Sequence, residues 1–457
     1  MHLTRGLKAV GKENGQITIL FAFLLPFLML FTGFAVDFGF GFLAKAELAK
    51  GCDAGNLAVM LNLGLGNASA EALGQDVFAL NYGQDPLFNS AAPTATFNIT
   101  KDANGNPYCT CTANAAIRTN FIRLMGISTL NVGDYSQATR PPVILSLVLD
   151  RTGSMLGNGG STAMPPAVEA FDQYFIEGTD QLGETSFAWS ATNDVPIATT
   201  FISNIQTSVT GLKFADGTYS MGGLVSGYNQ IEAVANPPVN AVKVVVFFTD
   251  GWDNTIQASL QNPTTNKSVN VEFGGNAATT SGFDEAPPTP NDFLAFIDPA
   301  NVDLNNGKGA GAGFYGGASQ PTTTMTCQDG GSGGYSVYAT DNMANCNGAT
   351  TFVPFGGPSD PLGTSAVAIN RINITKEAEY TTVQYAETLR AAGITVYAIG
   401  LGDDIDETYL QEIANDPASP SYSASEPSGI ALFAPQPTDL DTAFQTVAEK
   451  ILLRLTQ

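Results

Sequence analysis

The residues most able to do chemistry in this sequence follow the end of an apolar run. In VLDRTGSM (148–155) the apolar residues give way to Asp150, Thr152 and Ser154, each two positions from the next. Such a run predicts a buried strand, so the carboxylate and the two hydroxyls would lie just past its carboxyl end. Carboxylate and hydroxyl oxygens are ligands that hard divalent cations prefer. The stretch therefore indicates a cation site at the edge of a sheet.

Two further oxygen donors occupy comparable places later in the chain. Thr218 opens a predicted helix in DGTYSMGGL, and Asp250 follows the apolar run VVVFFT. We expect the five groups to meet at one edge of the sheet, because the carboxyl ends of parallel strands lie together. The alternative is that they only cap turns and helices, where Asp, Ser and Thr are common. The neighbouring Arg151 and Asp253 are expected to be solvated loop residues.

These positions resemble the metal-ion-dependent adhesion site of the von Willebrand factor A (vWA) family, whose motif is Asp-x-Ser-x-Ser followed by a Thr and an Asp. The resemblance covers about residues 141–255 and 366–457. It implies that Thr152, Ser154 and Thr218 offer hydroxyls to Mg²⁺, or to another divalent cation such as Mn²⁺ or Ca²⁺, while the two carboxylates hold coordinated waters. It also implies a coordination place left open for an Asp or Glu carboxylate of a protein partner, and no catalysis.

The second half of the chain shows the rhythm of an α/β fold. Apolar runs at 141–150, 240–251 and 393–402 alternate with helical patterns, which predicts a doubly wound, mostly parallel sheet of the vWA or Rossmann-like kind. The stretch 255–365 breaks this rhythm with Gly, Asn and Thr. It is interpreted as a loop-rich insertion, since a structureless loop of that length is rare in a compact domain. The acidic DDIDE (403–407) fits the first turn of a helix better than a second cation site.

The amino-terminal region carries a candidate membrane span. Residues 17–36 contain no charge and would form a helix roughly 30 Å long, about the thickness of a bilayer core. Arg5, Lys8 and Lys12 precede the run, so the amino terminus is expected in the cytoplasm. A cleaved signal peptide and a buried soluble helix are the alternatives, but the first usually has a shorter apolar core and the second is seldom uncharged on every face.

The segment after this span is predicted to continue the same helix and then change character. The pieces TATFNIT, NPYCTCTA and TLNVGDYSQATR read as short strands, and AIRTNFIRLMGI (116–127) as a short helix ending near Gly126. These strands and this helix make up a small α+β region.

The stretch GQITILFAFLLPFLMLFTGFAVDFG (15–39), with DAG at 53–55, resembles the amino terminus of Tad-type (tight adherence, Flp) pilus-assembly proteins, and the later TNFIRLMGISTLNV looks like the end of their extracytoplasmic region. The resemblance covers about residues 15–140. It implies a bacterial inner-membrane protein with its bulk in the periplasm or outside the cell, and other pilus or envelope components as partners. Pseudopilins of that system carry a Gly followed five residues later by Glu, whereas Gly15 is followed by Leu20. A retained anchor is therefore expected.

Composition excludes several functional classes. The chain has 42 acidic and 19 basic residues, a formal net charge of −23, which disfavours binding to nucleic acid. Its single histidine, His2, lies near the amino terminus, so a Ser/His/Asp hydrolase, a Cys/His protease or a His-ligated zinc site is not expected. Among the five cysteines, Cys327 and Cys346 could close one loop, Cys109 and Cys111 are too close for an easy mutual bridge, and free thiols are an equal alternative.

The expected function is that of a membrane-anchored, non-enzymatic adhesion or assembly protein. Two alternatives remain open: an envelope enzyme in which paired carboxylates and the Gly-rich insertion form a glycan-cleaving cleft, and a purely structural envelope component without bound metal. The chain is expected to begin with a cytoplasmic amino terminus (1–14), a transmembrane helix (15–37) and an extracytoplasmic helix with the small β-containing region (38–140). The first part of the vWA domain (141–254), the insertion (255–365) and the second part of the vWA domain (366–457) are expected to follow.

Overall fold

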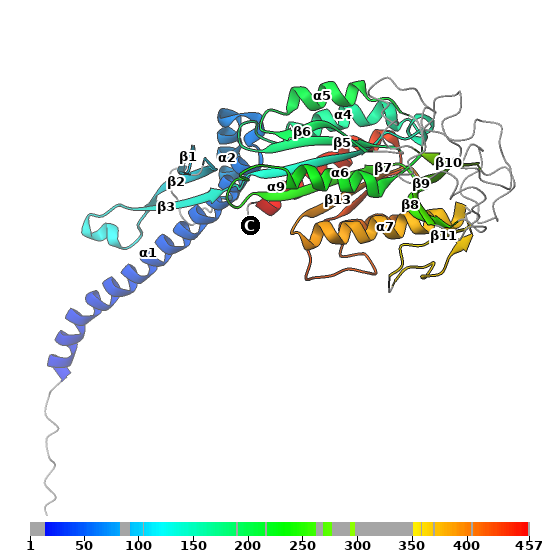
Figure 1. Cartoon of the computed structure of the whole chain (residues 1–457). Coiled ribbons are helices and arrows are strands. Elements are labelled where there is room, and N and C mark those ends of the chain that lie inside the picture. Colours follow the sequence, from blue (N-terminus) through cyan, green and yellow to red (C-terminus); the bar gives the residue numbers. More distant parts are fainter. Residues whose placement is uncertain are drawn as a thin grey trace, which may run out of the picture. The chain divides into compact units, whose positions relative to one another are not determined.

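The computed structural model describes residues 14–82, 92–103, 105–188, 191–214, 217–261, 268–276, 293–297, 351–357, 359–368, 371–403 and 405–455. The chain forms two compact units (Figure 1). One comprises Met1–Asp102 and Pro107–Arg140, and the other consists chiefly of Pro141–Leu455.

The amino-terminal unit is built on one long helix, α1 (Asn14–Leu61), of 48 residues. The helix formed by the apolar run therefore continues without a break into the segment after it, as expected. Among the described residues, α1 is the one helix long and apolar enough to cross a membrane, and its most apolar window has a mean hydropathy of 2.5. Large apolar side chains on its first half are exposed, with Phe23 at 71% and Phe31 at 70%.

A short helix and a small sheet pack on the second half of α1. A 3₁₀ turn, η1 (Leu63–Leu65), and a helix, α2 (Asn67–Asn81), come first, and α2 lies against α1 where Gly55 faces Gly74. A Cβ atom on Gly55 would lie 2.8 Å from the backbone oxygen of Gly74, so glycine is what permits this approach. The antiparallel strands β1 (Thr94–Lys101), β2 (Pro107–Arg118) and β3 (Thr129–Thr139) follow in that spatial order and confirm the three expected strands.

The prediction of a helix at 116–127 is wrong for its first residues, which belong to strand β2. Strand β2 continues to Arg118 because its side chains alternate between buried and exposed and it stays paired with β3 along its length. Only a 3₁₀ turn, η2 (Ile122–Met125), remains before Gly126, whose φ of +90° is a conformation that glycine adopts readily.

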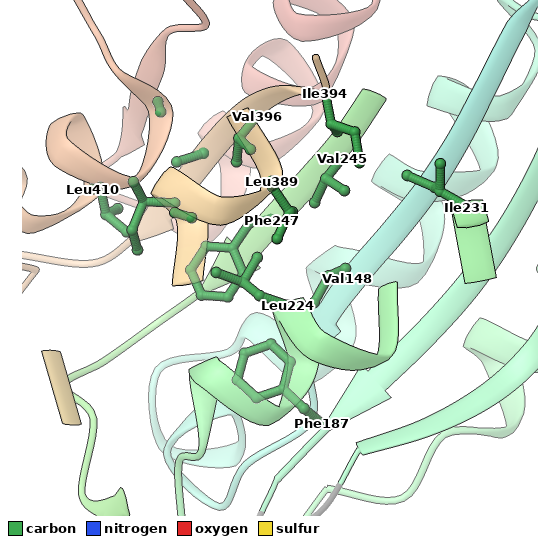
Figure 2. Close-up of a cluster of buried hydrophobic side chains, with 14 of the residues drawn as sticks. Val148, Phe187, Leu224, Ile231, Val245, Phe247, Leu389, Ile394, Val396 and Leu410 are labelled. Carbon is green, nitrogen blue, oxygen red and sulfur yellow. The ribbon is translucent and has the colours of Figure 1, made fainter. Parts of the chain in front are cut away.

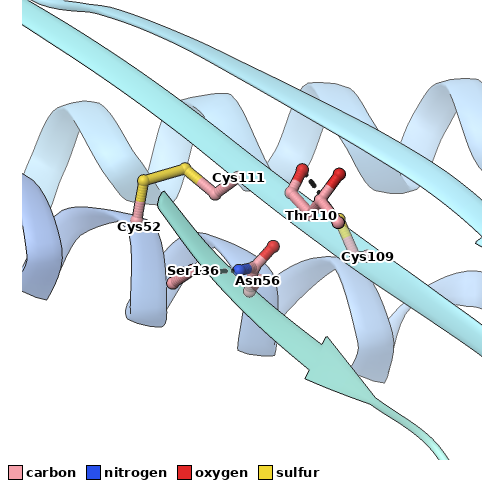
Figure 3. The surroundings of a disulfide bond; sticks show 6 residues. All are labelled: Cys52, Asn56, Cys109, Thr110, Cys111 and Ser136. Carbon is pink, nitrogen blue, oxygen red and sulfur yellow. Dashed lines mark hydrogen bonds between the residues drawn. A yellow bond between two sulfur atoms is a disulfide. The ribbon is translucent and has the colours of Figure 1, made fainter. Parts of the chain in front are cut away.

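A disulfide between Cys52 and Cys111 joins α1 to β2 (Figure 3). The two residues are 59 positions apart and their Cα atoms lie 5.5 Å apart. Cys109, two residues before Cys111 on β2, is a buried free thiol, and burial raises its pKa to about 11. Cys327 and Cys346 lie outside the described residues.

The second unit contains a six-stranded sheet in the order β14-β13-β7-β4-β5-β6. Each pair of neighbours is parallel except β5 and β6, so β6 is an antiparallel edge strand. The strands are β4 (Val143–Asp150), β5 (Gln181–Phe187), β6 (Ala191–Ala198), β7 (Val242–Thr249), β13 (Thr395–Leu401) and β14 (Ala431–Ala434). The expected doubly wound, mostly parallel sheet is confirmed.

Helices cover both faces of this sheet because its central strands alternate their side chains between two apolar cores. Phe247 belongs to one core, shown in Figure 2, which includes Leu224 of α6 and Leu389 of α7. The next residue, Phe248, lies on the other face, 5.7 Å from Phe444 of α9 between ring centroids. The helices are α3 (Ser154–Gly157), α4 (Gly160–Asp172), α5 (Ile202–Gly211), α6 (Ser220–Glu232), α7 (Arg371–Ala391), α8 (Glu407–Ala414) and α9 (Leu440–Leu455), with a 3₁₀ turn η4 (Pro437–Asp439).

The described parts of the interrupting stretch form a second, antiparallel sheet. Its order is β10-β9-β8-β11-β12, from β8 (Thr255–Gln261), β9 (Ser268–Asn276), β10 (Phe293–Ile297), β11 (Thr351–Val353) and β12 (Val367–Ala368). Paired strands therefore occur within the stretch expected to be loop-rich. Strand β8 begins six residues after β7 ends, past the carboxyl edge of the parallel sheet.

Candidate metal centre

Four of the five expected ligands come together at the carboxyl edge of the parallel sheet. Strands β4 and β7 are parallel neighbours, so Asp150 at the end of β4 and Asp250 just after β7 lie at the same edge. Thr152 follows in the turn between β4 and α3, and Ser154 is the first residue of α3. Their hydroxyl oxygens lie 2.8 Å apart. The Ser154 hydroxyl donates to Oδ1 of Asp250 at 2.7 Å, and the Thr152 hydroxyl is 3.5 Å from the same oxygen.

Asp150 is fully buried and shapes the turn that carries the hydroxyls. Its Oδ1 accepts a hydrogen bond from the backbone N–H of Thr152 at 2.8 Å, which is the Asx-type turn that Asp favours after a strand. Its Oδ2 accepts from the hydroxyl of Thr249, the last residue of β7, at 2.6 Å. Asp150 therefore joins the two strand ends that form the site.

Asp250 has a second partner that the sequence pattern did not single out. The side-chain amide of Asn158 donates to Oδ2 of Asp250 at 2.6 Å, and Oδ1 of Asn158 accepts from the backbone N–H of Gly160. Asn158 lies between α3 and α4 in a Gly-Asn-Gly-Gly stretch, which predicts a loop but no ligand role. The only feature of the sequence that could have pointed to Asn158 as a partner of Asp250 is its closeness to Ser154.

Thr218 is buried and connected to the loop after β7 through its backbone. Its N–H donates to Oδ1 of Asn254 at 2.7 Å, and its carbonyl oxygen accepts from the N–H of Asn254 at 3.1 Å. Asn254 lies four residues after Asp250, so this pair brings the Thr218 loop to the same edge. Within the described part of the chain, no side-chain hydrogen bond joins Thr218 to the other four expected ligands.

The expectation that Arg151 and Asp253 are solvated is wrong, because both are fully buried. Nε of Arg151 donates to the hydroxyl of Ser186 on β5 at 2.9 Å, so this side chain lies along the sheet edge. Asp253 accepts from three hydroxyls, those of Ser220 on α6, Thr382 on α7 at 2.9 Å and Tyr409 on α8 at 2.7 Å.

The environment of Asp253 explains how a carboxylate is buried there. Burial raises its pKa to about 6, although its three hydroxyl donors act in the opposite direction. These donors come from three helices on one face of the sheet, and a loop residue with such partners cannot be recognised from its own neighbourhood in sequence. Asp253 therefore ties α6, α7 and α8 to the loop that carries Asp250.

The two carboxylates of the expected site are close enough to disfavour each other's charge. Burial raises the pKa of Asp150 and of Asp250, and the charge of Asp150 raises that of Asp250 further. The hydrogen-bond donors to both are hydroxyl, amide and backbone N–H groups, all of them neutral. A cation would therefore compensate charge that these neutral partners leave uncompensated.

The donor set fits a hard divalent cation. It consists of oxygens only, from two carboxylates and from hydroxyls that can accept a cation in place of donating to Asp250. Among the described residues there is no cluster of three or more His, Cys, Asp or Glu side chains that could hold a metal ion. With the described residues alone, an ion at this edge would depend on hydroxyl oxygens as well as on the two carboxylates.

The amino-terminal segment matches a family model, and the chain is similar to several solved structures. No curated protein sequence matches the chain. Residues 15–62 match the model of the Tad family, which is described as Flp pilus-assembly TadE/G-like. This match confirms the Tad-type resemblance over that segment.

Solved structures similar to the chain include two pilus proteins and one protein with an occupied metal site. The vWF domain of the type V pili tip protein Mfa5 from Porphyromonas gingivalis is 16% identical, with 70% of this chain and 98% of that one covered at a TM-score of 0.38. The PilB minor pilin from Streptococcus sanguinis is 13% identical, with 82% and 81% covered at a TM-score of 0.38. Proximal thread matrix protein 1 from the mussel byssus, with a zinc-occupied MIDAS motif, is 12% identical, with 68% and 46% covered at a TM-score of 0.32.

This chain spans less than half of the mussel protein. The chain joins an amino-terminal segment that matches the TadE/G-like model to a unit built on a doubly wound, mostly parallel sheet.

Proposed function

We propose that this protein is a membrane-anchored, non-enzymatic component of the cell envelope that binds a protein partner through a divalent cation in Tad/Flp pilus assembly or adhesion. The cation, Mg²⁺ in the first instance, would be held by Asp150, Thr152, Ser154, Thr218 and Asp250. The partner would supply an Asp or Glu carboxylate. The TadE/G-like segment supports the pilus context, and the oxygen cluster supports the cation.

The observation that carries the proposal is the sharing of one oxygen, Oδ1 of Asp250, by the hydroxyls of Ser154 and Thr152. Such hydroxyls can rotate, so the same oxygens that now face Asp250 can face a cation between them. When bound, the ion supplies a positive centre with Lewis-acid character that attracts a carboxylate. The two Asp side chains balance its charge, and Thr249 and Asn158 hold those Asp side chains in place.

The proposed location is the bacterial inner membrane, with α1 as a single retained span. The amino terminus would be cytoplasmic, because the basic residues Arg5, Lys8 and Lys12 precede the apolar run. The α/β unit would then lie in the periplasm or outside the cell. The absence of Glu five residues after Gly15 supports a span that is kept.

The cation site can be tested on the full chain in lipid nanodiscs by titration with Mn²⁺, followed by electron paramagnetic resonance of the free ion. We expect one saturable site that Mg²⁺ competes for. Asp250→Ala and Ser154→Ala should each weaken Mn²⁺ binding at least tenfold. Glu232→Gln is the matched control, because Glu232 is a carboxylate at the opposite edge of the sheet, paired with Lys243 at 2.6 Å. Equal Mn²⁺ binding by all four proteins would remove the metal from the proposal.

The partner is tested separately, in envelope extract passed over the immobilised full chain with Mg²⁺ or with chelator. A partner of the proposed kind is captured with Mg²⁺, is released by chelator, and is not captured by Asp150→Ala. Capture that is identical in all three conditions would leave a structural role without metal. Release of reducing sugars from envelope glycan by the purified chain would instead favour the enzyme alternative.

A further inference from the structure

The turn that joins β2 to β3 exposes a group of large apolar side chains. We name residues 119–128 the hairpin tip; it includes η2 and lies beside α1 in Figure 1. Leu124 is the most exposed of its apolar residues, and the four exposed ones with their exposed fractions are Phe121 (44%), Leu124 (83%), Met125 (56%) and Ile127 (50%). Surface hydrophobic residues gathered in this way mark an interaction site more often than scattered ones do.

The hairpin tip is fixed at one level of α1. The carboxylate of Asp37 accepts hydrogen bonds from the backbone N–H groups of Asn120, Phe121 and Ile122, at 2.8, 2.8 and 2.7 Å. One turn earlier on α1, a Cβ atom on Gly33 would lie 2.5 Å from Cβ of Phe121, so the absence of a side chain there lets the tip approach. The tip therefore meets α1 between residues 33 and 37.

This level is where the uncharged run of α1 ends. Residues 17–36 carry no charge, and Asp37 is the first charged residue after them. The α1 side chains on either side of this level are exposed and apolar, with Phe31 at 70% and Phe38 at 48%. If α1 spans a membrane, the hairpin tip lies at the boundary between the hydrocarbon and the headgroups on the carboxyl-terminal side of the span.

The charge of the hairpin tip differs in sign from that of the chain as a whole. Arg123 in the tip and Arg118, the last residue of β2 just before the tip, are exposed, and no Asp or Glu occurs in the sequence between Asp102 and Asp134. The chain as a whole carries more than two acidic residues for each basic one. Two arginines beside exposed Phe, Leu, Met and Ile side chains are complementary to the interface of a lipid bilayer, where anionic phosphates lie next to the hydrocarbon.

We propose that the hairpin tip is a second membrane contact, in which the side chains of Phe121, Leu124 and Met125 enter the interface of the bilayer that α1 spans. Arg118 and Arg123 contact the lipid phosphates. This inference rests on the membrane anchoring in the proposed function but not on the cation site. Through Asp37 and Gly33, such a contact fixes the rotation and the depth of α1, so the small sheet stands in one orientation on the membrane.

The experiment uses added tryptophans and brominated lipids, with the full chain in nanodiscs. Leu124→Trp places a reporter in the tip, and Leu80→Trp is its control, because Leu80 on α2 is equally exposed at 84%. The neighbouring Phe78 packs at Gly51, about 20 Å further along α1 than Asp37. Leu25→Trp, measured with bromines near the ends of the acyl chains, reports on the span itself. The two native tryptophans, Trp189 and Trp252, give a background that is measured in the unsubstituted chain.

We expect bromines placed near the headgroups to reduce the added emission of Leu124→Trp at least twofold and to leave that of Leu80→Trp unchanged. Quenching of Leu25→Trp without quenching of Leu124→Trp would overturn the hairpin contact while leaving the anchor intact, and the tip would then face a protein. If Leu25→Trp is not quenched either, the anchoring fails and the tip contact fails with it.

The two arginines are tested in the same assay by changing the lipid. In Leu124→Trp, quenching should increase when part of the zwitterionic lipid is replaced by phosphatidylglycerol. Adding Arg118→Gln and Arg123→Gln should abolish that increase. An increase that persists in the triple variant would refute the phosphate contact.

Discussion

Each of the two units buries a carboxylate close to the surface that we propose it uses for binding, and the donors around these carboxylates differ in kind. Asp37 of the amino-terminal unit, 3% exposed, receives three backbone N–H groups. Asp250 of the α/β unit, 6% exposed, receives two hydroxyls and one side-chain amide. A backbone N–H can only donate, whereas a hydroxyl can donate or accept.

This difference separates a structural carboxylate from one that can take part in binding. The partners of Asp37 have no alternative role, so that carboxylate joins the hairpin tip to α1. The hydroxyls of Thr152 and Ser154 can turn their lone pairs to a cation while Asp250 balances its charge. Burial of an acidic residue alone therefore does not predict a metal site; the chemistry of its donors does.

If the two units unfold independently, a substitution in the core of the α/β unit should destabilise that unit alone. This is the largest loss of stability that we predict. Phe248 is fully buried between the central sheet and Phe444, so Phe248→Ala should lower the free energy of unfolding of that unit by about 3–5 kcal/mol. Hydrogen exchange of the full chain, followed by mass spectrometry, reports on each unit separately. Phe355→Ala, at a residue 72% exposed, should change little. A loss of protection of equal size in β1–β3 would show that the units do not unfold independently.

The next effect belongs to the amino-terminal unit alone. Replacing Cys52 and Cys111 together by Ala removes a crosslink over 59 residues, and this should cost about 2–4 kcal/mol in that unit. Protection of α1 and β2 against hydrogen exchange should fall while that of β4 and β7 stays unchanged. Cys109→Ala is the control, because Cys109 is a buried thiol outside the disulfide. A larger loss from Cys109→Ala than from the double variant would contradict the role of the disulfide.

Neutralising Asp37 tests its role as a structural carboxylate. Asp37→Asn keeps the shape but removes the negative charge that three backbone N–H groups share, and it should destabilise the hairpin tip by about 2–3 kcal/mol. The exchange rates of the amides of Asn120, Phe121 and Ile122 measure this directly. Unchanged exchange at these three amides would mean that packing at Gly33, and not the carboxylate, holds the tip.

Neutralising Glu184, on β5, should have the opposite effect from neutralising Asp37: it should raise the free energy of unfolding at high pH. Burial raises the pKa of Glu184 to about 8, and nearby Asp194 adds to the shift. Because the folded protein keeps a proton that the unfolded chain loses near pH 4.5, stability is full below that pH and falls as pH rises to about 8. One pKa unit corresponds to about 1.4 kcal/mol, so even a partly relieved shift lowers the free energy of unfolding by about 2 kcal/mol.

Glu184→Gln should remove this part of the pH dependence and stabilise the α/β unit above pH 8. Denaturant unfolding at pH 5 and at pH 9, in chelator, measures it. Equal pH dependence in the variant and the unsubstituted chain would assign the effect to other carboxyl groups.

The central strands and four members of the candidate site could be predicted because their signals are local. β4, β7 and β13 are mostly apolar runs, as expected of strands buried on both faces, and the residues at the ends of β4 and β7 then meet at one edge. Elements at the edge of the sheet carry no such signal. Strand β14 has only four residues, and only three residues separate α5 from the end of β6. Neither was expected.

What could not be predicted depends on register between distant segments. The Cys52–Cys111 pairing requires knowing which turn of α1 lies over which residue of β2, and 59 intervening residues leave that open. The burial of Arg151 and Asp253 likewise depends on partners from β5, α6, α7 and α8. A polar residue in a loop is usually solvated, but Asp253 is buried because it accepts hydrogen bonds from three helices that pack at this edge of the sheet.

The smallest effect concerns the acidic stretch DDIDE. Asp406 is the N-cap of α8, where its side chain accepts from the backbone N–H of Tyr409 at 3.1 Å, as expected for a helix start. Asp406→Ala should cost about 1 kcal/mol, whereas Asp406→Asn, which keeps an acceptor oxygen, should cost little. Thermal unfolding and exchange at α8 measure both. The second-cation-site alternative for this stretch would be favoured if Asp406→Ala and Asp406→Asn lost a bound Mn²⁺ ion equally while α8 kept its protection, because a cap tolerates Asn and a charged ligand site does not.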